Sequence, residues 1–99
     1  MTNHMATRAV QRSSDLAILP GELLEEELVV RGMTQKDLSR ETGRPARAIS
    51  EIIRGKKRIT PETAVDLERV LGTPASFWLK LESNFQLTMA RLRRQQASR

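Results

Sequence analysis

The residues best suited to chemistry in this sequence are basic, and they are concentrated in one short segment. Between residues 44 and 59, six arginines and lysines stand against a single acid, Glu51. The six are Arg44, Arg47, Arg54, Lys56, Lys57 and Arg58. Guanidinium and ammonium groups bind phosphate, and a guanidinium can also donate two parallel hydrogen bonds to guanine. The segment therefore predicts contact with a polyanion, and a merely solvated basic surface is the alternative.

Catalytic chemistry has little to draw on in this chain. It has no cysteine, which removes thiol nucleophiles, disulfides and cysteine-ligated metals, and its one histidine, His4, lies in a polar N-terminal segment. No stretch approaches the ~18 apolar residues of a membrane span, and the opening residues lack the apolar block of a signal peptide. We expect no enzyme activity, cofactor, metal site or membrane association, and a cytoplasmic location.

The elements that must position the basic residues are helices in one small domain. Ninety-nine residues suffice for one core. We expect a mobile N-terminal arm over residues 1–15, a domain over 16–96 and a tail over 97–99. Caps, first-turn prolines and terminal glycines predict helices over residues 20–31, 34–42, 45–54, 60–71 and 75–96. No segment alternates like a strand, so the predicted fold is all-α with five helices, the last one longer.

The second and third of these helices have the pattern of a helix-turn-helix. Leu38, Ile49 and Ile52 are apolar at positions that face inward where two such helices cross. Ser39 is small enough to let the helices approach, and Gly43 can supply the left-handed backbone of a tight turn. A DNA-binding motif is therefore predicted, with a purely structural helix hairpin as the alternative.

The outward side of the third helix would then face DNA. Arg47, near its start, is the candidate to read guanine, although a phosphate contact or a solvated arginine is also open. Ala46 suits a thymine methyl, Ser50 either base type, and Gln35 a phosphate. The predicted DNA-binding set is Gln35, Arg44, Ala46, Arg47, Ser50, Arg54, Lys56, Lys57 and Arg58.

The last helix carries an apolar stripe. Its large apolar residues follow one another at spacings of four, four, four and three from Phe77 to Leu92. Such a stripe packs in the core or forms a dimer contact, and both remain open. The tentative dimer interface is Phe77, Trp78, Leu81, Phe85 and Met89.

Two stretches of the sequence resemble a known family. The run from Ala46 to Ala64, with its block Arg-Gly-Lys-Lys-Arg-Ile-Thr, and the run from Leu71 to Phe77-Trp78-Leu79 resemble HigA-type antitoxins, which belong to the phage-repressor-like (Xre) helix-turn-helix class. The opening Leu19-Pro-Gly-Glu22 is similar too. One departure is Arg44-Pro45, which replaces the usual small residue and hydroxyl cap, so the third helix loses a side-chain cap.

The resemblance implies a five-helix homodimer that binds a palindrome in its own promoter and neutralises a ribosome-dependent, mRNA-cleaving toxin. The function predicted is therefore a sequence-specific repressor that is also the antitoxin of a type II toxin–antitoxin system. Its expected partners are double-stranded DNA with an inverted repeat, a second copy of the chain and a cognate toxin. The alternatives are a stand-alone regulator without a toxin, and a protein-interaction module with weak DNA binding.

Overall fold

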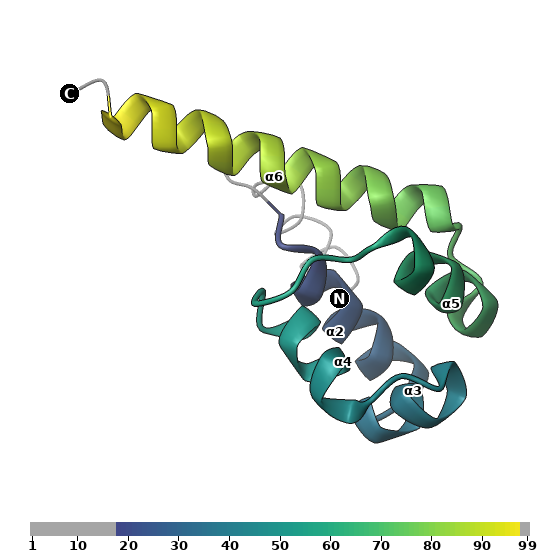
Figure 1. Cartoon of the computed structure of the whole chain (residues 1–99). Helices are drawn as coiled ribbons and strands as arrows, with labels where there is room; N and C mark the ends of the chain where they lie inside the picture. The colour runs from purple at the N-terminus through teal and green to yellow at the C-terminus, as the bar shows by residue number, and fades with distance from the viewer. Residues whose placement is uncertain (1–17, 98–99) are drawn as a thin grey trace.

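The computed structural model describes residues 18–97, which form five helices and no strand (Figure 1). The helices are α2 (Pro20–Arg31), α3 (Gln35–Thr42), α4 (Ala46–Ile53), α5 (Pro61–Leu71) and α6 (Ala75–Ala97). The all-α prediction with a longer last helix is confirmed. The predicted N-terminal arm and His4 lie outside the described residues, as do residues 98 and 99 of the predicted tail.

Side-chain caps mark the starts of α3 and α5, whereas α4 begins without one. The Thr34 hydroxyl accepts a hydrogen bond from the Asp37 N–H at 3.0 Å, and the Thr34 N–H donates to Asp37 Oδ2 at 2.9 Å. This is a complete capping box with Asp in the place of Glu or Gln. Thr60 caps α5 through the Thr63 N–H, whereas Pro45 precedes α4 without a side-chain hydrogen bond. The predicted loss of a cap at α4 is therefore confirmed.

The capping box at α3 should make stability sensitive to acid. The pKa of Asp37 is lowered, chiefly by the hydrogen bond from the Thr34 N–H, then by the Thr34 hydroxyl and the Arg40 guanidinium. A carboxyl whose folded pKa lies below its unfolded pKa of about 4 stabilises the fold above that value, and loses this contribution as pH falls through the folded pKa. We expect Asp37→Asn to lower stability at pH 6 and to converge on the wild type as pH falls below the folded pKa of Asp37.

Urea unfolding, followed by circular dichroism from pH 6 to pH 2.5, measures this convergence. Lys36→Gln, which changes a charge in the same turn but leaves the cap in place, is the control and should not show it. Parallel loss of stability in the wild type and Asp37→Asn would contradict the assignment.

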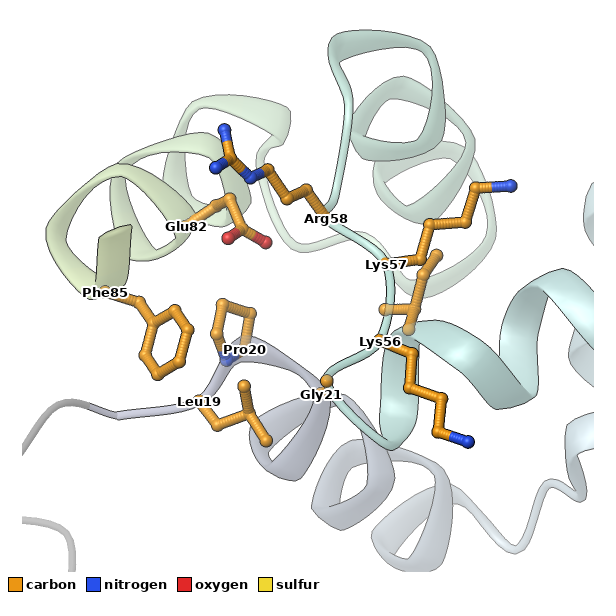
Figure 2. Close-up of a pocket in the computed structure, with 10 residues that line it drawn as sticks. Leu19, Pro20, Gly21, Lys56, Lys57, Arg58, Glu82 and Phe85 are labelled. Atoms are coloured by element: carbon orange, nitrogen blue, oxygen red, sulfur yellow. The ribbon is translucent and has the colours of Figure 1, made fainter. Parts of the chain in front are cut away.

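A buried carboxylate fastens α6 to the segment that carries the basic residues. Glu82 is 8% exposed; its Oε1 accepts from the Ile59 N–H at 2.8 Å and its Oε2 from Gln86 Nε2 at 2.8 Å. Both oxygens are therefore satisfied, as a buried carboxylate requires. Figure 2 shows Glu82 near Pro20 and Phe85, on the side of the link between α4 and α5 that faces α6. This contact holds the link against α6, so the basic side chains on it start from a fixed backbone.

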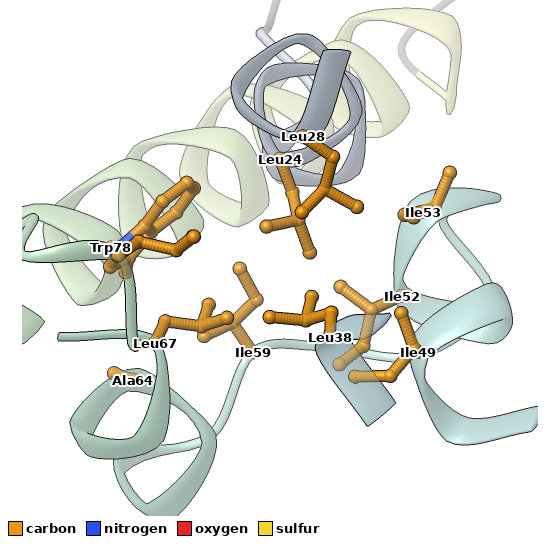
Figure 3. Packing of buried hydrophobic residues seen from close by; sticks show 11 residues of the cluster. Leu24, Leu28, Leu38, Ile49, Ile52, Ile53, Ile59, Ala64, Leu67 and Trp78 are labelled. Carbon is orange, nitrogen blue, oxygen red and sulfur yellow. The ribbon is translucent and has the colours of Figure 1, made fainter. Parts of the chain in front are cut away.

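One apolar core joins all five helices (Figure 3). Leu38, Ile49 and Ile52 are 0 to 3% exposed, so the predicted inward face of the helix-turn-helix is confirmed. Trp78 is 0% exposed, and its indole N–H has no hydrogen-bond partner among the described residues. Its tentative assignment to the dimer interface is corrected: the ring fills the core of its own chain, because none of its surface is left for a partner.

The helices α2 and α4 touch backbone to backbone at Gly21. A Cβ atom at this position would lie 2.1 Å from the Ile52 carbonyl oxygen and 2.5 Å from that of Ile53. Real Cβ atoms do not approach carbonyl oxygens this closely, so only glycine fits. The buried Gly21 therefore sets the distance between α2 and the end of α4.

Candidate nucleic-acid interface

The turn between α3 and α4 is closed by four local hydrogen bonds. Gly43 has a φ of 77°, the left-handed conformation that the sequence predicts, and its N–H donates to the Ser39 carbonyl at 2.9 Å. The Ser39 hydroxyl donates to the Arg44 carbonyl at 2.5 Å, so Ser39 locks the turn besides being small. The hydroxyl of Thr42, which is 8% exposed, donates to the Leu38 carbonyl at 2.7 Å and accepts from the Arg44 N–H at 3.3 Å. The angle between the two helices is therefore fixed locally.

A groove of about 500 Å³ lies between the start of α3 and the outer side of α4. It brings together six of the nine predicted DNA-binding residues. They are Gln35, Ala46, Arg47, Ser50, Arg54 and Lys56. The side chain of Arg47 is 88% exposed at this surface. The groove thus presents amide, hydroxyl and guanidinium groups, which are the groups that contact base edges and phosphates.

Residues 54–60, between α4 and α5, form what we call the basic link. Two of its residues, Lys57 and Arg58, lie outside the groove and line a smaller cleft of about 140 Å³ between this link, α2 and α6. Figure 2 shows the Arg58 side chain directed towards Glu82, while the side chains of Lys56 and Lys57 point away from that carboxylate. The basic side chains of this link therefore point in two different directions. Lys57 is available to a polyanion, whereas Arg58 lies beside the carboxylate that holds the link.

Arg44 is also separated from the groove, because it faces α5. Its Nε lies 2.7 Å from Asp66 Oδ2, and the two side chains are 28% and 24% exposed. Arg69 contacts the other oxygen of Asp66 at 3.4 Å and donates to the Glu41 carbonyl at 3.2 Å. Arg44 thus ties the turn to α5, a role that its place in the basic segment did not suggest.

Comparison with known proteins agrees with this geometry. Residues 24–78 match the family model described as Helix-turn-helix. This chain belongs to the helix-turn-helix family. Virulence-associated protein I of Dichelobacter nodosus is 37% identical over 75 residues, which cover 75% of this chain and 69% of that protein.

Two solved structures share the arrangement of this helix-turn-helix protein over 82% of its chain. An addiction module antidote protein of the HigA family from Coxiella burnetii is 32% identical, with a TM-score of 0.76 over 82% of this chain and 89% of that one. Antitoxin HigA of Pseudomonas aeruginosa, solved with the higBA promoter, is 29% identical, with a TM-score of 0.77 over the same shares. The resemblance to HigA-type antitoxins is confirmed. This is a family of regulators and antitoxins, and the chain is not an enzyme.

Two residues of the helix-turn-helix groove escaped the sequence prediction. Lys36 and Glu51 line it beside the predicted residues. The signal for Glu51 was present, because it follows Arg47 by four positions and therefore lies on the same side of a helix. Its Oε2 is 3.4 Å from Arg47 Nε. Composition alone offered no reason to place Glu51 in a DNA-binding surface, because a carboxylate is repelled by phosphates.

The stripe on α6 is only partly available to a partner. Phe77 is 42% exposed and packs edge-on against Trp78, with ring centroids 5.5 Å apart, while Leu81, Phe85 and Met89 are half-buried. Leu87, for which the sequence carried no prediction, is 49% exposed.

Among the described residues, none of the helices is long and apolar enough to cross a membrane, and no cluster of acidic residues, histidine or cysteine is placed to hold a metal ion.

The Arg44–Asp66 pair gives a direct test of how the turn is anchored. Asp66→Asn removes the charge that faces both Arg44 and Arg69, so we expect it to lower the free energy of unfolding by about 1 kcal/mol. For a domain of this size, that corresponds to a fall of roughly 5 °C in Tm. Differential scanning calorimetry measures it, and Glu62→Gln at the exposed start of the same helix is the matched control. Equal melting of both variants would show that Asp66 does not hold the turn.

Proposed function

We propose that this protein is a sequence-specific DNA-binding repressor, and that it is the antitoxin of a type II toxin–antitoxin system. The observation that carries the first part is the groove, where six predicted residues from α3, α4 and the following link share one surface. Its chemistry suits DNA, and the relative from Pseudomonas aeruginosa was solved with promoter DNA.

In this proposal α4 enters the major groove of DNA. Arg47 donates two hydrogen bonds to O6 and N7 of a guanine, Ala46 contacts a thymine methyl and Ser50 contacts a base of either type. Gln35, at the start of α3, contacts a phosphate beside the groove. Lys56 and Lys57 add electrostatic affinity that depends little on sequence, because phosphates are the same at every base pair.

Two copies are required for tight recognition. We propose that the stripe of α6, made of the exposed Phe77 and the half-buried Leu81, Phe85 and Met89, forms a two-fold contact with the same stripe of a second copy. Two α4 helices related in this way would reach successive major grooves, about 34 Å or about 10 base pairs apart. The operator would then be an inverted repeat upstream of the protein's own gene.

The antitoxin part of the proposal is supported by the relatives, one an addiction module antidote and the other an antitoxin. The partner would be a ribosome-dependent, mRNA-cleaving toxin, encoded beside this chain, and the repressor would control both genes. Co-expression with the neighbouring reading frame tests this. Recovery of a stable complex, together with relief of growth arrest, supports it, while failure of both leaves the stand-alone regulator.

DNA binding is tested by fluorescence anisotropy with two duplexes, one from upstream of the gene and one with the same bases scrambled. We expect a preference of about 10³-fold or more for the upstream duplex, and a log–log salt slope that indicates several phosphate contacts. Equal binding to both duplexes, lost near physiological salt, would contradict the repressor and favour the protein-interaction module.

Dimer formation is tested by light scattering on a sizing column. The wild type should elute at twice the chain mass, and Met89→Glu should shift it towards the monomer, because a carboxylate would be buried in an apolar contact. Gln95→Glu, an exposed change on the same helix, is the control. A dimer that persists in Met89→Glu would place the contact elsewhere.

A further inference from the structure

Glu51 is the one acidic residue among those that line the groove. The other lining residues are neutral or basic: Gln35, Lys36, Ala46, Arg47, Ser50, Arg54 and Lys56. The Glu51 side chain is 33% exposed, so its carboxylate reaches the surface that would face DNA. Phosphates repel a carboxylate at such a surface, so a carboxylate here would oppose the binding of any duplex, whatever its sequence.

The structure also shows what Glu51 does locally. Its Oε2 lies 3.4 Å from Arg47 Nε, one helical turn away, and this is the ion pair that Arg47 makes among the described residues. Because the pair is made through Nε, it does not use the two terminal nitrogens of the guanidinium, which are the donors that can meet the O6 and N7 acceptors of guanine. An arginine side chain that is 88% exposed can adopt many rotamers when it has no partner. The ion pair with Glu51 favours those rotamers that keep Nε near the carboxylate.

The rest of the site does not depend on the Glu51 side chain. Its backbone carbonyl, not its carboxylate, accepts hydrogen bonds from the N–H groups of Lys56 and Lys57, at 2.8 Å and 3.2 Å. Replacing the side chain therefore leaves the end of α4 and the basic link in place. This separates an effect on recognition from an effect on the fold.

We propose that Glu51 is a positioning residue that determines sequence specificity: it holds Arg47 in the direction for reading a base, and it repels duplexes that offer no guanine in return. This inference rests on the proposed function as a DNA-binding repressor. In this view, the preference for one DNA sequence over another comes from the Arg47–Glu51 pair and not from Arg47 alone.

The test is a double-mutant cycle of Glu51→Gln and Arg47→Ala, measured by anisotropy with the upstream and the scrambled duplex. Glu51→Gln keeps the shape and removes the charge. We expect it to tighten binding to the scrambled duplex about fivefold, as for one charge pair near a protein surface, and to leave the upstream duplex within about twofold. The specificity ratio then falls about fivefold. In the Arg47→Ala background, Glu51→Gln should tighten both duplexes alike and leave the ratio unchanged.

The control is Glu25→Gln, an exposed change of the same type on α2 that lies away from the groove, and it should alter neither duplex. Unchanged Tm in Glu51→Gln verifies that the fold is intact. A wild type that prefers the upstream duplex, with a ratio that Glu51→Gln does not change, would overturn this inference alone. A fall in the ratio that persists without Arg47 would also overturn it, because Glu51 would then read a base itself. A wild type without any preference would overturn the proposed function and this inference together.

Discussion

Replacing Arg47 with alanine is expected to lower the preference for the upstream duplex over the scrambled one by about 10- to 100-fold. The estimate follows from a bidentate arginine–guanine contact, which contributes ~1–3 kcal/mol of discrimination, and a tenfold ratio corresponds to ~1.4 kcal/mol. Arg47 lies in the first turn of α4 and lines the groove, and its side chain is 88% exposed. The loss should therefore appear in DNA binding and not in Tm. Anisotropy titrations with both duplexes measure it.

Lys57→Ala is the matched control, since it removes one positive charge from a residue outside the groove. We expect it to weaken binding to both duplexes by similar factors and to reduce the salt slope by about 1. If the two variants changed the specificity ratio equally, the division between a base-reading arginine and a phosphate-binding lysine would be wrong.

Gly21→Ala is expected to lower the free energy of unfolding by about 3 kcal/mol, at the upper end of the usual range for overpacking. The added methyl group would overlap the Ile52 carbonyl oxygen at 2.1 Å, and neighbouring backbone cannot rotate away as a side chain can. α2 must then shift from the end of α4, which loosens the packing of Leu24. Against a total stability of about 5–10 kcal/mol for a small domain, the change is large.

Urea unfolding followed by tryptophan fluorescence measures this loss, because Trp78 is the only tryptophan and is fully buried in the core. The control is Glu25→Ala on the exposed side of the same helix, which should change stability by no more than about 0.5 kcal/mol. A Gly21→Ala protein as stable as the control would show that α2 can move away from α4 without losing core contacts.

The sequence by itself determined where the helices begin and end, and which side of α4 faces out. The Thr34–Asp37 capping box, the Thr60–Pro61 start and the left-handed Gly43 act within a few residues, so their chemistry can be read from neighbours in the chain. The inward Leu38, Ile49 and Ile52 follow the helical period for the same reason. The outward residues of α4, and hence most of the groove, followed from that period.

Only the tertiary structure decided which contacts form between residues far apart in the chain, and hence which basic and aromatic side chains remain exposed to a partner. Arg44 pairs with Asp66, 22 positions away, and Glu82 receives the Ile59 N–H across 23 positions. Trp78 belongs to the core rather than to a surface, and Gly21 is required by the backbone of α4. The physical reason is common to all four. Composition and periodicity describe a helix and its faces, whereas a contact between distant residues depends on the angle and distance at which two helices cross. Those are set by the packing of the whole core.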